Sequence, residues 1–381
     1  MAQGCSGTYA LTYSLRTAPA PVYLSLQAEN PILQRTDPST IDRVRDLDHL
    51  EDLLSEPTAG VVDTVRRLEG DVIVLGVGGK MGPSLARMIR RAADEAGVRK
   101  RVIGVSRFSS QDLPRQLNGW GVETIACDLL DPDALGRLPD VPNVVFMAGM
   151  KFGSTGQQAR TWAMNAVLPA YVARKFRGAK IVAFSTGNVY PMVPVTSGGA
   201  SESEEPRPVG EYAQSCLGRE RVFDHFSRVD GTPTALIRLN YAVEMRYGVV
   251  IDLAQRVLAG ETIDLAMGNF NCVWQGDANA VSIRTFDHVA SPPFVLNVTG
   301  PETLSVRGVC EQLGRLMGRD VKFAGAESPT AYLNNSALSN RLFGYPRVPV
   351  QQVITWAAEW VKRGGASLGK PTHFETRDGK F

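Results

Sequence analysis

The most regular feature of the sequence is a series of short apolar runs that starts at Asp71 and alternates with longer amphipathic segments. The runs are rich in β-branched residues and almost continuously apolar, as is typical of strands buried on both faces. Amphipathic helices between such strands predict an α/β fold with a doubly wound, Rossmann-type parallel sheet. The predicted strands are residues 71–76, 101–107, 122–127, 143–149, 180–186, 234–239 and 294–300.

The chain before this alternation has a different pattern. Residues 1 to about 45 are poorly periodic and rich in Thr, Ser and Pro, which predicts an irregular extension. Residues 55–70 predict a helix, with Ser55 as its N-cap and Gly70 as its stop. We therefore expect an N-terminal extension with one helix over residues 1–70.

Three segments interrupt or follow the alternation and predict a second lobe over the carboxyl ends of the strands, where such sheets bind ligands. They are residues 187–211, 240–293 and 301–381. The expected organisation is a dinucleotide-binding domain over residues 71–239, with a further strand at 294–300. A smaller C-terminal substrate lobe with a polar tail follows, mainly over residues 240–381.

Composition excludes several classes of function. The 41 basic and 39 acidic residues nearly balance, which argues against nucleic acid or a membrane surface as the main partner. No apolar run approaches the roughly 20 residues of a membrane span, and the first residues lack the layout of a signal peptide. The five cysteines form no CxxC pair and the four histidines show no HxxxH spacing. We expect a cytoplasmic protein with reduced thiols and no metal.

The candidate chemistry begins at the turn after the first strand. The sequence "VLGVGGKMGPSLARMIRRA" places Gly76, Gly79 and Gly82 in G-x-x-G-x-x-G spacing between a strand and an amphipathic helix. Such glycines allow a tight turn, an approach of the backbone to a pyrophosphate and close packing of helix on strand. We expect this turn, with Lys80 and Met81, to bind a dinucleotide; the alternative is a structural glycine turn.

The end of the second strand bears on the choice of cofactor. Where an NAD-selective site has an acidic residue, this chain has Ser106, followed by Arg107. An arginine at that place can pair with a 2′-phosphate, which favours NADP over NAD. The alternative is that Arg107 is only a solvated charge. Asp128 and Leu129, after the third strand, are candidates for the adenine edge.

Several blocks then match a known family in order. The chain resembles the extended short-chain dehydrogenase/reductase family, especially sugar epimerases and dehydratases of the UDP-galactose 4-epimerase kind, from about residue 71 to about 362. The matching blocks are "GVGGKMG", "CDLL", "MAGMKFG", "WAMNAVLPA", "FSTGNVYP" and "EYAQSCLGRE". The resemblance implies cofactor contacts at Ala148, Gly149 and Lys151, and a structural asparagine at Asn165.

The resemblance also implies the catalytic groups. Tyr212 corresponds to the family's acid–base tyrosine and Thr186 to its catalytic Ser/Thr, which holds the reacting oxygen. Cys216 stands where the family has a lysine that favours the tyrosinate form by its charge. Three interpretations stay open: Lys151 or the nicotinamide supplies the missing charge, Tyr212 is mainly an acid or not the key base, or the protein only binds a dinucleotide as a sensor or scaffold. A nucleophilic Cys216 is a fourth.

The substrate half departs from the family's pattern. Alignment places Phe270 where the epimerase has a diphosphate-binding arginine, Trp274 in place of a histidine and Tyr241 in place of an asparagine. A clamp on a nucleotide diphosphate is thereby lost, so we expect a sugar, keto-sugar or sugar acid that is not nucleotide-linked. The candidate substrate residues are Asn188, Tyr241, Arg246, Trp274 and Gln275. The simpler alternatives are core packing for Trp274 and a surface charge for Arg246.

Two further features concern partners. Residues 364–381 are Gly-rich and polar, which fits either disorder or docking through Phe374 and Phe381. The helices containing Asn165 and Tyr212 have broad apolar faces, and the resemblance implies a homodimer through them. The leading hypothesis is an NAD(P)-dependent oxidoreductase or epimerase acting on a carbohydrate hydroxyl or carbonyl. The alternatives are a non-catalytic dinucleotide-binding protein and a nucleotide-sugar epimerase or dehydratase.

Overall fold

The computed structural model describes Met1 and residues 38–151 and 156–380. Most of the predicted irregular extension, Cys5 and the anchor Phe381 lie outside the described residues. From Asp37 onward the chain forms one unit by its contacts.

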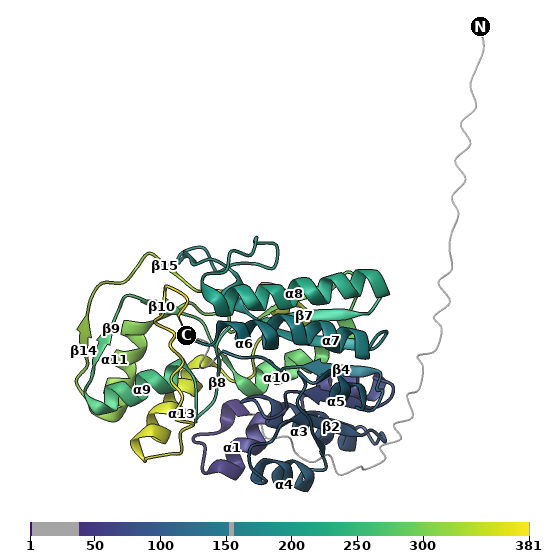
Figure 1. Cartoon of the computed structure of the whole chain (residues 1–381). Helices are drawn as coiled ribbons and strands as arrows, with labels where there is room; N and C mark the ends of the chain where they lie inside the picture. The colour runs from purple at the N-terminus through teal and green to yellow at the C-terminus, as the bar shows by residue number, and fades with distance from the viewer. Residues whose placement is uncertain (2–37, 152–155, 381) are drawn as a thin grey trace. The chain divides into compact units, whose positions relative to one another are not determined.

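A seven-stranded sheet organises this unit (Figure 1). All its strand pairs are parallel, in the order β12-β7-β5-β4-β1-β2-β3. The first half of the chain adds strands toward one edge and the second half toward the other, so the sheet is doubly wound and the predicted fold class is confirmed. Its strands are β1 Val72–Leu75, β2 Val102–Ser106, β3 Glu123–Ala126, β4 Asn143–Phe146, β5 Lys180–Thr186, β7 Thr234–Leu239 and β12 Phe294–Val298, all within predicted runs.

Both faces of the sheet are covered because alternate side chains of each central strand point into different cores. Val72 and Val74 join a cluster with α2 Ala59–Arg67, α3 Gly82–Glu95 and α10 Gln275–Arg284. Ile73 and Leu75 join a cluster on the other face, with helices α5, α7 and α8. The bounds of the helices and helical turns not yet given in this layer are α4 Asp112–Gly119, α5 Pro132–Gly136, α6 Gln158–Trp162, the π-helix η2 Ala163–Val167, α7 Leu168–Lys175, η3 Gly187–Val189, α8 Gly210–Asp230 and η4 Thr285–His288.

A third core lies among the later helices, as the grouping of α9, α11 and α13 shows in Figure 1. Small two-stranded sheets connect these helices to the main sheet region. The elements are β6 Val193–Pro194, β8 Ala242–Val243, α9 Val249–Ala259, β9 Thr262–Asp264, β10 Asn269–Phe270, β11 Val273–Trp274, β13 Leu304–Ser305, α11 Val306–Met317, β14 Lys322–Ala324, β15 Thr330–Ala331, α12 Ala337–Phe343 and α13 Val350–Lys362.

The segment before β1 has more structure than the sequence predicted. It contains the 3-10 turn η1 Pro38–Thr40 and a helix α1 Leu47–Leu54 before α2. Ser55 is the C-cap of α1, and the N-cap of α2 is Thr58, whose side chain accepts a hydrogen bond from the Val61 backbone at 3.1 Å. The prediction of Ser55 as an N-cap was therefore wrong. Leu50, Leu53 and Leu54 make α1 part of the third core.

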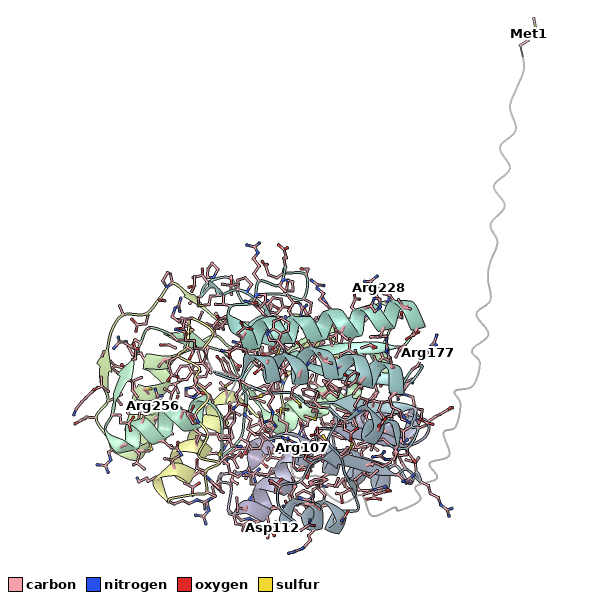
Figure 2. All side chains as sticks on the ribbon, in the orientation of Figure 1. Met1, Arg107, Asp112, Arg177, Arg228 and Arg256 are labelled. Carbon is pink, nitrogen blue, oxygen red and sulfur yellow. The ribbon has the colours of Figure 1, made fainter. Side chains whose placement is uncertain are left out.

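The C-terminal tail, residues 363–380, docks on the protein rather than leaving it. Asp252 accepts hydrogen bonds from the backbone and hydroxyl of Thr372 at 2.7 and 2.6 Å. Phe374 is buried against Phe270, and Arg256 (labelled in Figure 2) pairs with Glu375 at 2.8 Å.

The end of the tail reaches the start of α8. Gly210 and Gly379 both have positive φ, at 82° and 74°, and their backbones pack too closely for a Cβ on either residue. Docking, one of the two interpretations of the tail, is therefore correct for residues 363–380.

Candidate functional site

A cavity of about 540 Å³ opens at the carboxyl ends of the central strands. It extends from the glycine turn after β1, past the ends of β4, β5 and β7, to α1 and the tail. The predicted site residues that line it are Gly76, Gly79, Lys80, Met81, Gly82, Gly149, Lys151, Thr186, Asn188, Tyr212, Tyr241, Arg246 and Gln275. The structure thus brings together residues more than 190 positions apart in the sequence.

The glycine turn has the backbone geometry of an anion site. Gly76 has φ of 91°, and a Cβ there would lie 2.6 Å from the backbone nitrogen of Ala148. Gly82 begins α3 and packs on Val77, again without room for a Cβ. Met81 precedes α3 and makes no side-chain cap hydrogen bond. The first N–H groups of α3 therefore face the cavity region with the positive end of the helix dipole.

Lysines surround this turn. The Nζ atom of Lys80 lies 2.9 Å from the ring centroid of Tyr247, and Lys151 and the tail residue Lys370 line the same cavity. Burial, reinforced by the charge of Lys151, lowers the pKa of Lys80 to about 6. Burial also lowers the pKa of Lys151 to about 8. A bound anion would reverse both effects, because it favours the charged amine.

The predicted catalytic pair is in contact. The hydroxyl of Tyr212 is hydrogen-bonded to the side chains of Thr186 and Cys216. The hydroxyl of Thr186 also donates to Oδ1 of Asn188 at 3.0 Å. Burial raises the pKa of Tyr212 well above its usual value, so the resting side chain is a neutral phenol that can donate a proton.

Cys216 is fully buried beside this pair and does not line the cavity. Burial raises the pKa of its thiol. A neutral, inaccessible thiol is a poor nucleophile, so the arrangement favours packing as the role of Cys216.

Asn165 organises the wall behind the site from the π-helix η2, an insertion that is frequent at functional sites. Its amide nitrogen donates to the Met150 carbonyl and to Oγ of Ser215, both at 3.0 Å. Its Oδ1 accepts from the Met150 backbone at 2.8 Å and from Arg219 at 2.7 Å. Asn165 thereby fixes the residue before Lys151 and does not itself line the cavity.

Arg219 is a cavity residue that the sequence analysis missed. It lies on α8 and is 6% exposed, and its guanidinium donates to the Phe184 carbonyl at 2.7 Å as well as to Asn165. A signal was present, since residues 212, 216 and 219 follow the helical period of one face. Other missed lining residues are Glu51, Leu113, Gln116, Asn240, Tyr247, Leu368 and Lys370.

Two predicted substrate residues have other roles. Trp274 is 1% exposed and packs edge-to-face on Trp356 at 5.4 Å, so it belongs to the core and not to the cavity. Arg246 lines the cavity, but it pairs with Glu51 at 2.6 Å and Glu244 at 2.9 Å. Its charge is therefore already met by two carboxylates of the protein, and it is neither an unpaired substrate cation nor a surface charge.

Gln275, Asn188 and Tyr241 remain candidates for substrate contacts. Gln275 is held by a hydrogen bond from its Nε2 to Oγ of Ser84 at 3.1 Å. Tyr241 adopts a positive φ of 46°, an uncommon conformation for an aromatic residue that turns the chain at the end of β7.

The residues predicted at the adenosine end lie at the strand ends but outside the cavity lining. Ser106 packs on Gly78, and Arg107 (labelled in Figure 2) is exposed directly after β2. Asp128 is exposed and accepts a hydrogen bond from the Leu130 backbone at 3.1 Å, while Leu129 is buried. Ala148 lies behind Gly76.

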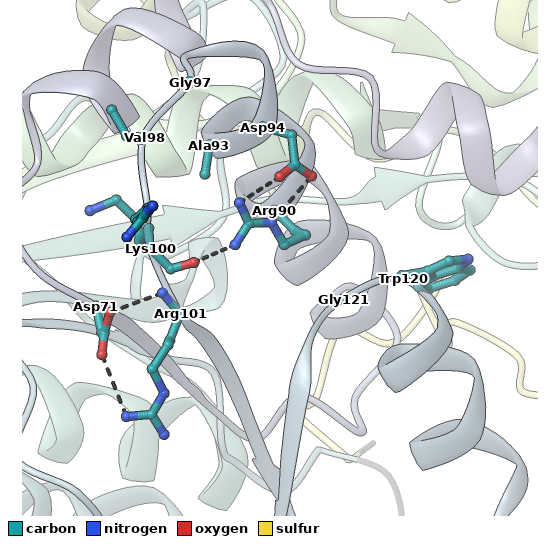
Figure 3. Close-up of a pocket in the computed structure, with 11 residues that line it drawn as sticks. Asp71, Arg90, Ala93, Asp94, Gly97, Val98, Lys100, Arg101, Trp120 and Gly121 are labelled. Carbon is teal, nitrogen blue, oxygen red and sulfur yellow. Dashed lines mark hydrogen bonds and ion pairs between the residues drawn. The ribbon is translucent and has the colours of Figure 1, made fainter.

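A second cavity of about 710 Å³ lies at the opposite, amino ends of β1 and β2 (Figure 3). Four of its charged groups are paired with one another: Arg90 with Asp94 at 2.7 Å, and Arg101 with Asp71 at 3.6 Å. The Lys100 amine is bonded to the carbonyls of Leu68 and Gly70. These internal pairs leave little to recognise a ligand, so the larger hollow is not the candidate site.

Within the described residues, no cluster of His, Cys, Asp or Glu is arranged to hold a metal ion, and the four described cysteines are unpaired. No helix in the described part of the chain is long and apolar enough to cross a membrane.

Comparison with known proteins gives similarity of structure alone. No family model and no curated protein sequence matches the chain. UDP-glucose 4-epimerase of Thermotoga maritima, solved with UDP-glucose, is 18% identical over 77% of this chain and 99% of its own, with a TM-score of 0.62. The dTDP-glucose 4,6-dehydratase of Bacillus anthracis, solved with NAD, is 14% identical over 78% and 97%, with a TM-score of 0.66. UDP-glucuronic acid 4-epimerase of Bacillus cereus, solved with NAD, is 16% identical over 77% and 96%, with a TM-score of 0.64. These similarities confirm the fold that the sequence resemblance implied.

Proposed function

We propose that this protein is an NAD(P)-dependent oxidoreductase or epimerase that transfers hydride at a hydroxyl-bearing or carbonyl carbon of a carbohydrate. The observation that carries the proposal is the hydrogen-bonded pair of Tyr212 and Thr186 in the wall of a cavity that also contains the glycine turn. A proton-transferring hydroxyl and a dinucleotide site are the two parts that such a reaction needs in one place.

The chain's residues fit a nicotinamide dinucleotide. Gly76 and Gly79 have no side chains, so their backbone groups are accessible from the cavity that they line. The N-terminus of α3 and Lys80 provide positive charge for a pyrophosphate. When bound, the nicotinamide accepts or returns the hydride. Arg107, exposed after Ser106, supports NADP as the preferred form. Solved structures of the same fold contain NAD.

Tyr212 moves the proton. Its hydroxyl donates a proton to a carbonyl oxygen during reduction, and its phenolate form accepts the proton of an alcohol during oxidation. Thr186 holds the same oxygen in line by a hydrogen bond. Asn165 holds two parts of the wall in place: its bonds to the Met150 backbone fix the residue before Lys151, and its Oδ1 accepts from the guanidinium of Arg219. The wall of the site is therefore preorganised.

The lining favours a carbohydrate that carries a carboxylate. Lys80, Lys151 and Lys370 line the cavity, and a bound carboxylate would favour the charged forms of Lys80 and Lys151, whose pKa values burial lowers. Asn188 and Gln275 offer amides for hydroxyl groups. Phe270 is buried against Phe374, which leaves no cation at the place of the family's diphosphate clamp. A sugar acid or keto-sugar acid that is not nucleotide-linked fits these features.

A nucleotide sugar is the second candidate, because the Thermotoga epimerase of the same fold was solved with UDP-glucose. The two candidates differ in where the protein needs cations to bind the negative charge of the substrate. A sugar acid needs one cation near Tyr212, whereas a nucleotide sugar needs cations for its diphosphate, far from Tyr212. Binding without catalysis is the third outcome, motivated by Cys216.

A substrate panel tests these alternatives. Purified protein is incubated with NAD or NADP and with D-glucose, D-galactose, D-glucuronate, D-galacturonate, UDP-glucose or UDP-glucuronate, and reduced cofactor is followed at 340 nm. Products are also analysed by chromatography, since an epimerase shows no net redox change. We expect turnover of a uronate. Turnover of the UDP-sugars alone would support the second candidate, and dinucleotide binding without any product would support the third.

Tyr212→Phe tests the mechanism, with the exposed Tyr345→Phe as its matched control. Loss of the proton-transferring hydroxyl should lower kcat by about 100- to 10,000-fold while the dinucleotide Kd stays unchanged. Unaltered turnover in Tyr212→Phe would remove Tyr212 from the mechanism.

A further inference from the structure

The surroundings of Tyr212 disfavour the phenolate form that it would need in order to act as a base. Burial raises its pKa well above the usual value, and the neighbouring Cys216 raises it further. To act as a base near neutral pH, Tyr212 must be in its phenolate form, and a fixed positive charge close to it favours that form. The thiol of Cys216, one helical turn away, supplies none.

Arg219 lies where such a charge is useful. Tyr212, Cys216 and Arg219 follow i, i+4, i+7 spacing on α8, which places them along one face of the helix. Arginine side chains on a helix lean toward its N-terminus, here toward Tyr212. Arg219 lines the same cavity as Tyr212, and its charge acts to lower the pKa of both Tyr212 and Cys216.

The guanidinium is held without being neutralised. Its two hydrogen-bond acceptors, the Phe184 carbonyl and Oδ1 of Asn165, are both uncharged. Among residues 38–151 and 156–380, Arg219 forms no ion pair, and its buried Nε has no hydrogen-bond partner. The adjacent Glu220 instead pairs with Arg238 at 2.7 Å and accepts from Ser185 at 2.6 Å.

Lys151 is the other cation near the tyrosine, with Nζ 5.8 Å from the ring centroid. Its pKa of about 8 means that it loses charge in the pH range where a tyrosinate would form. A guanidinium keeps its charge throughout that range. Of these two cations, Arg219 is therefore the one whose positive charge stays constant in the pH range where Tyr212 would lose its proton.

We propose that Arg219 is a positioning residue for Tyr212, whose guanidinium is the fixed positive charge that lets Tyr212 accept the substrate proton. The inference rests on the proposed function. In oxidation, Tyr212 first loses its own proton to solvent; the substrate O–H bond then breaks and its proton goes to the phenolate Oη of Tyr212. The hydride leaves the same carbon for the oxidised nicotinamide, and the C=O bond forms. Arg219 stabilises the phenolate and exchanges no proton.

The first experiment compares pH profiles. Wild type, Arg219→Lys, Arg219→Gln and the control Arg221→Gln, an exposed arginine on the same helix, are assayed with the uronates and UDP-sugars of the panel. In Arg219→Gln we expect the basic group of the kcat profile to move up by about 1–2 pH units, with a 10- to 100-fold loss at pH 7. Arg219→Lys should restore most of the wild-type pH profile and most of the wild-type kcat at pH 7. The KM of each variant should change little. An unmoved profile in a folded Arg219→Gln overturns the proposal.

The second experiment needs no substrate. Tyrosinate absorbance is titrated in wild type and in Arg219→Gln, each with and without saturating NAD, and the Tyr212→Phe titration of the same background is subtracted. Circular dichroism identifies the pH range in which each protein is folded. We expect the Tyr212 signal at lower pH in wild type than in Arg219→Gln, with Arg219→Lys between them. Coincident curves overturn the proposal.

The two experiments separate this inference from the proposed function. Absence of any turnover in wild type counts against the proposed function, while the titration still decides the role of Arg219. Turnover in wild type with identical profiles in the Arg219 variants counts against the inference alone.

Discussion

The side chains of Tyr212 and Cys216, four residues apart on α8, are hydrogen-bonded to each other in a corner of the cavity wall, where Cys216 is fully buried and Tyr212 is partly buried. The corner already contains the charges of Arg219 and Lys151. A third cation placed there would be repelled by both and would lose its hydration.

Cys216→Lys therefore should not increase turnover in the assay of the proposed function. We expect it to lower the free energy of unfolding by about 3 kcal/mol, because the new amine is buried without an anionic partner, and to reduce turnover. Cys216→Ser keeps the size and a hydrogen-bonding group and should stay within about 1 kcal/mol of wild type. Urea denaturation and the panel assay measure both. A faster Cys216→Lys would mean that the native site lacks positive charge.

Proton uptake should accompany dinucleotide binding. In the free protein the pKa of Lys80 is about 6, so at pH 8 its amine is mostly neutral. A pyrophosphate beside it raises that pKa toward the ordinary value, and the amine then takes up about one proton. Calorimetry at pH 8 in buffers of different ionisation enthalpy measures this number.

Lys80→Met removes the proton uptake that is due to Lys80. The difference in proton uptake between wild type and this variant therefore separates the contribution of Lys80 from that of Lys151. The same group makes wild-type stability rise with pH above about 6, because the unfolded state keeps the proton that the folded state has lost. The free energy of unfolding of wild type minus that of Lys80→Met should therefore rise with pH above about 6. A difference that does not change with pH would contradict the lowered pKa of Lys80.

Asn165 should be important for stability as well as for the site. Asn165→Ala removes five hydrogen bonds, one of them a long contact to Sγ of Cys216, and leaves the Met150 backbone and Arg219 without these partners in a buried place. We expect a loss of about 2–4 kcal/mol in denaturant unfolding. Asn118→Ala, at an exposed helix position, is the control and should change stability by less than about 0.5 kcal/mol.

Cofactor preference should depend on Arg107. If it pairs with a 2′-phosphate, Arg107→Ala raises the Kd for NADP by about 10-fold and leaves the Kd for NAD unchanged. Fluorescence titration with both dinucleotides makes the comparison. Equal losses for both forms would indicate a general effect on the strand end.

An expected homodimer can be tested at the face formed by η2 and α8. Val167 is 45% exposed and Trp162 is 36% exposed, while Gly218 of α8 packs closely on Ala166 and Trp162. Val167→Asp should convert a dimer to a monomer in analytical ultracentrifugation. Val229→Asp, at the exposed far end of α8, is the control and should leave the sedimentation coefficient unchanged. A monomeric wild type would refute the expectation.

The fold was predictable because every central strand is short, apolar and β-branched, and each is followed by a helical pattern. The glycine turn was predictable for a similar reason, since its spacing is local, and the family resemblance was sufficient to place Tyr212 and Thr186 in one cavity. Trp274 and Arg246 were not, because their roles depend on Trp356 and on Glu51, which is 195 residues from Arg246. Helix α1, only eight residues long, gave too short a periodic pattern to be recognised.

The contact between Gly379 and Gly210 places the last described residues of the tail against the first residue of the helix that carries Tyr212. Neither glycine has room for a Cβ there, so a substitution at either residue would separate the tail from the first turn of α8. The position of that turn, which carries Tyr212, therefore depends on a segment more than 160 residues later in the sequence.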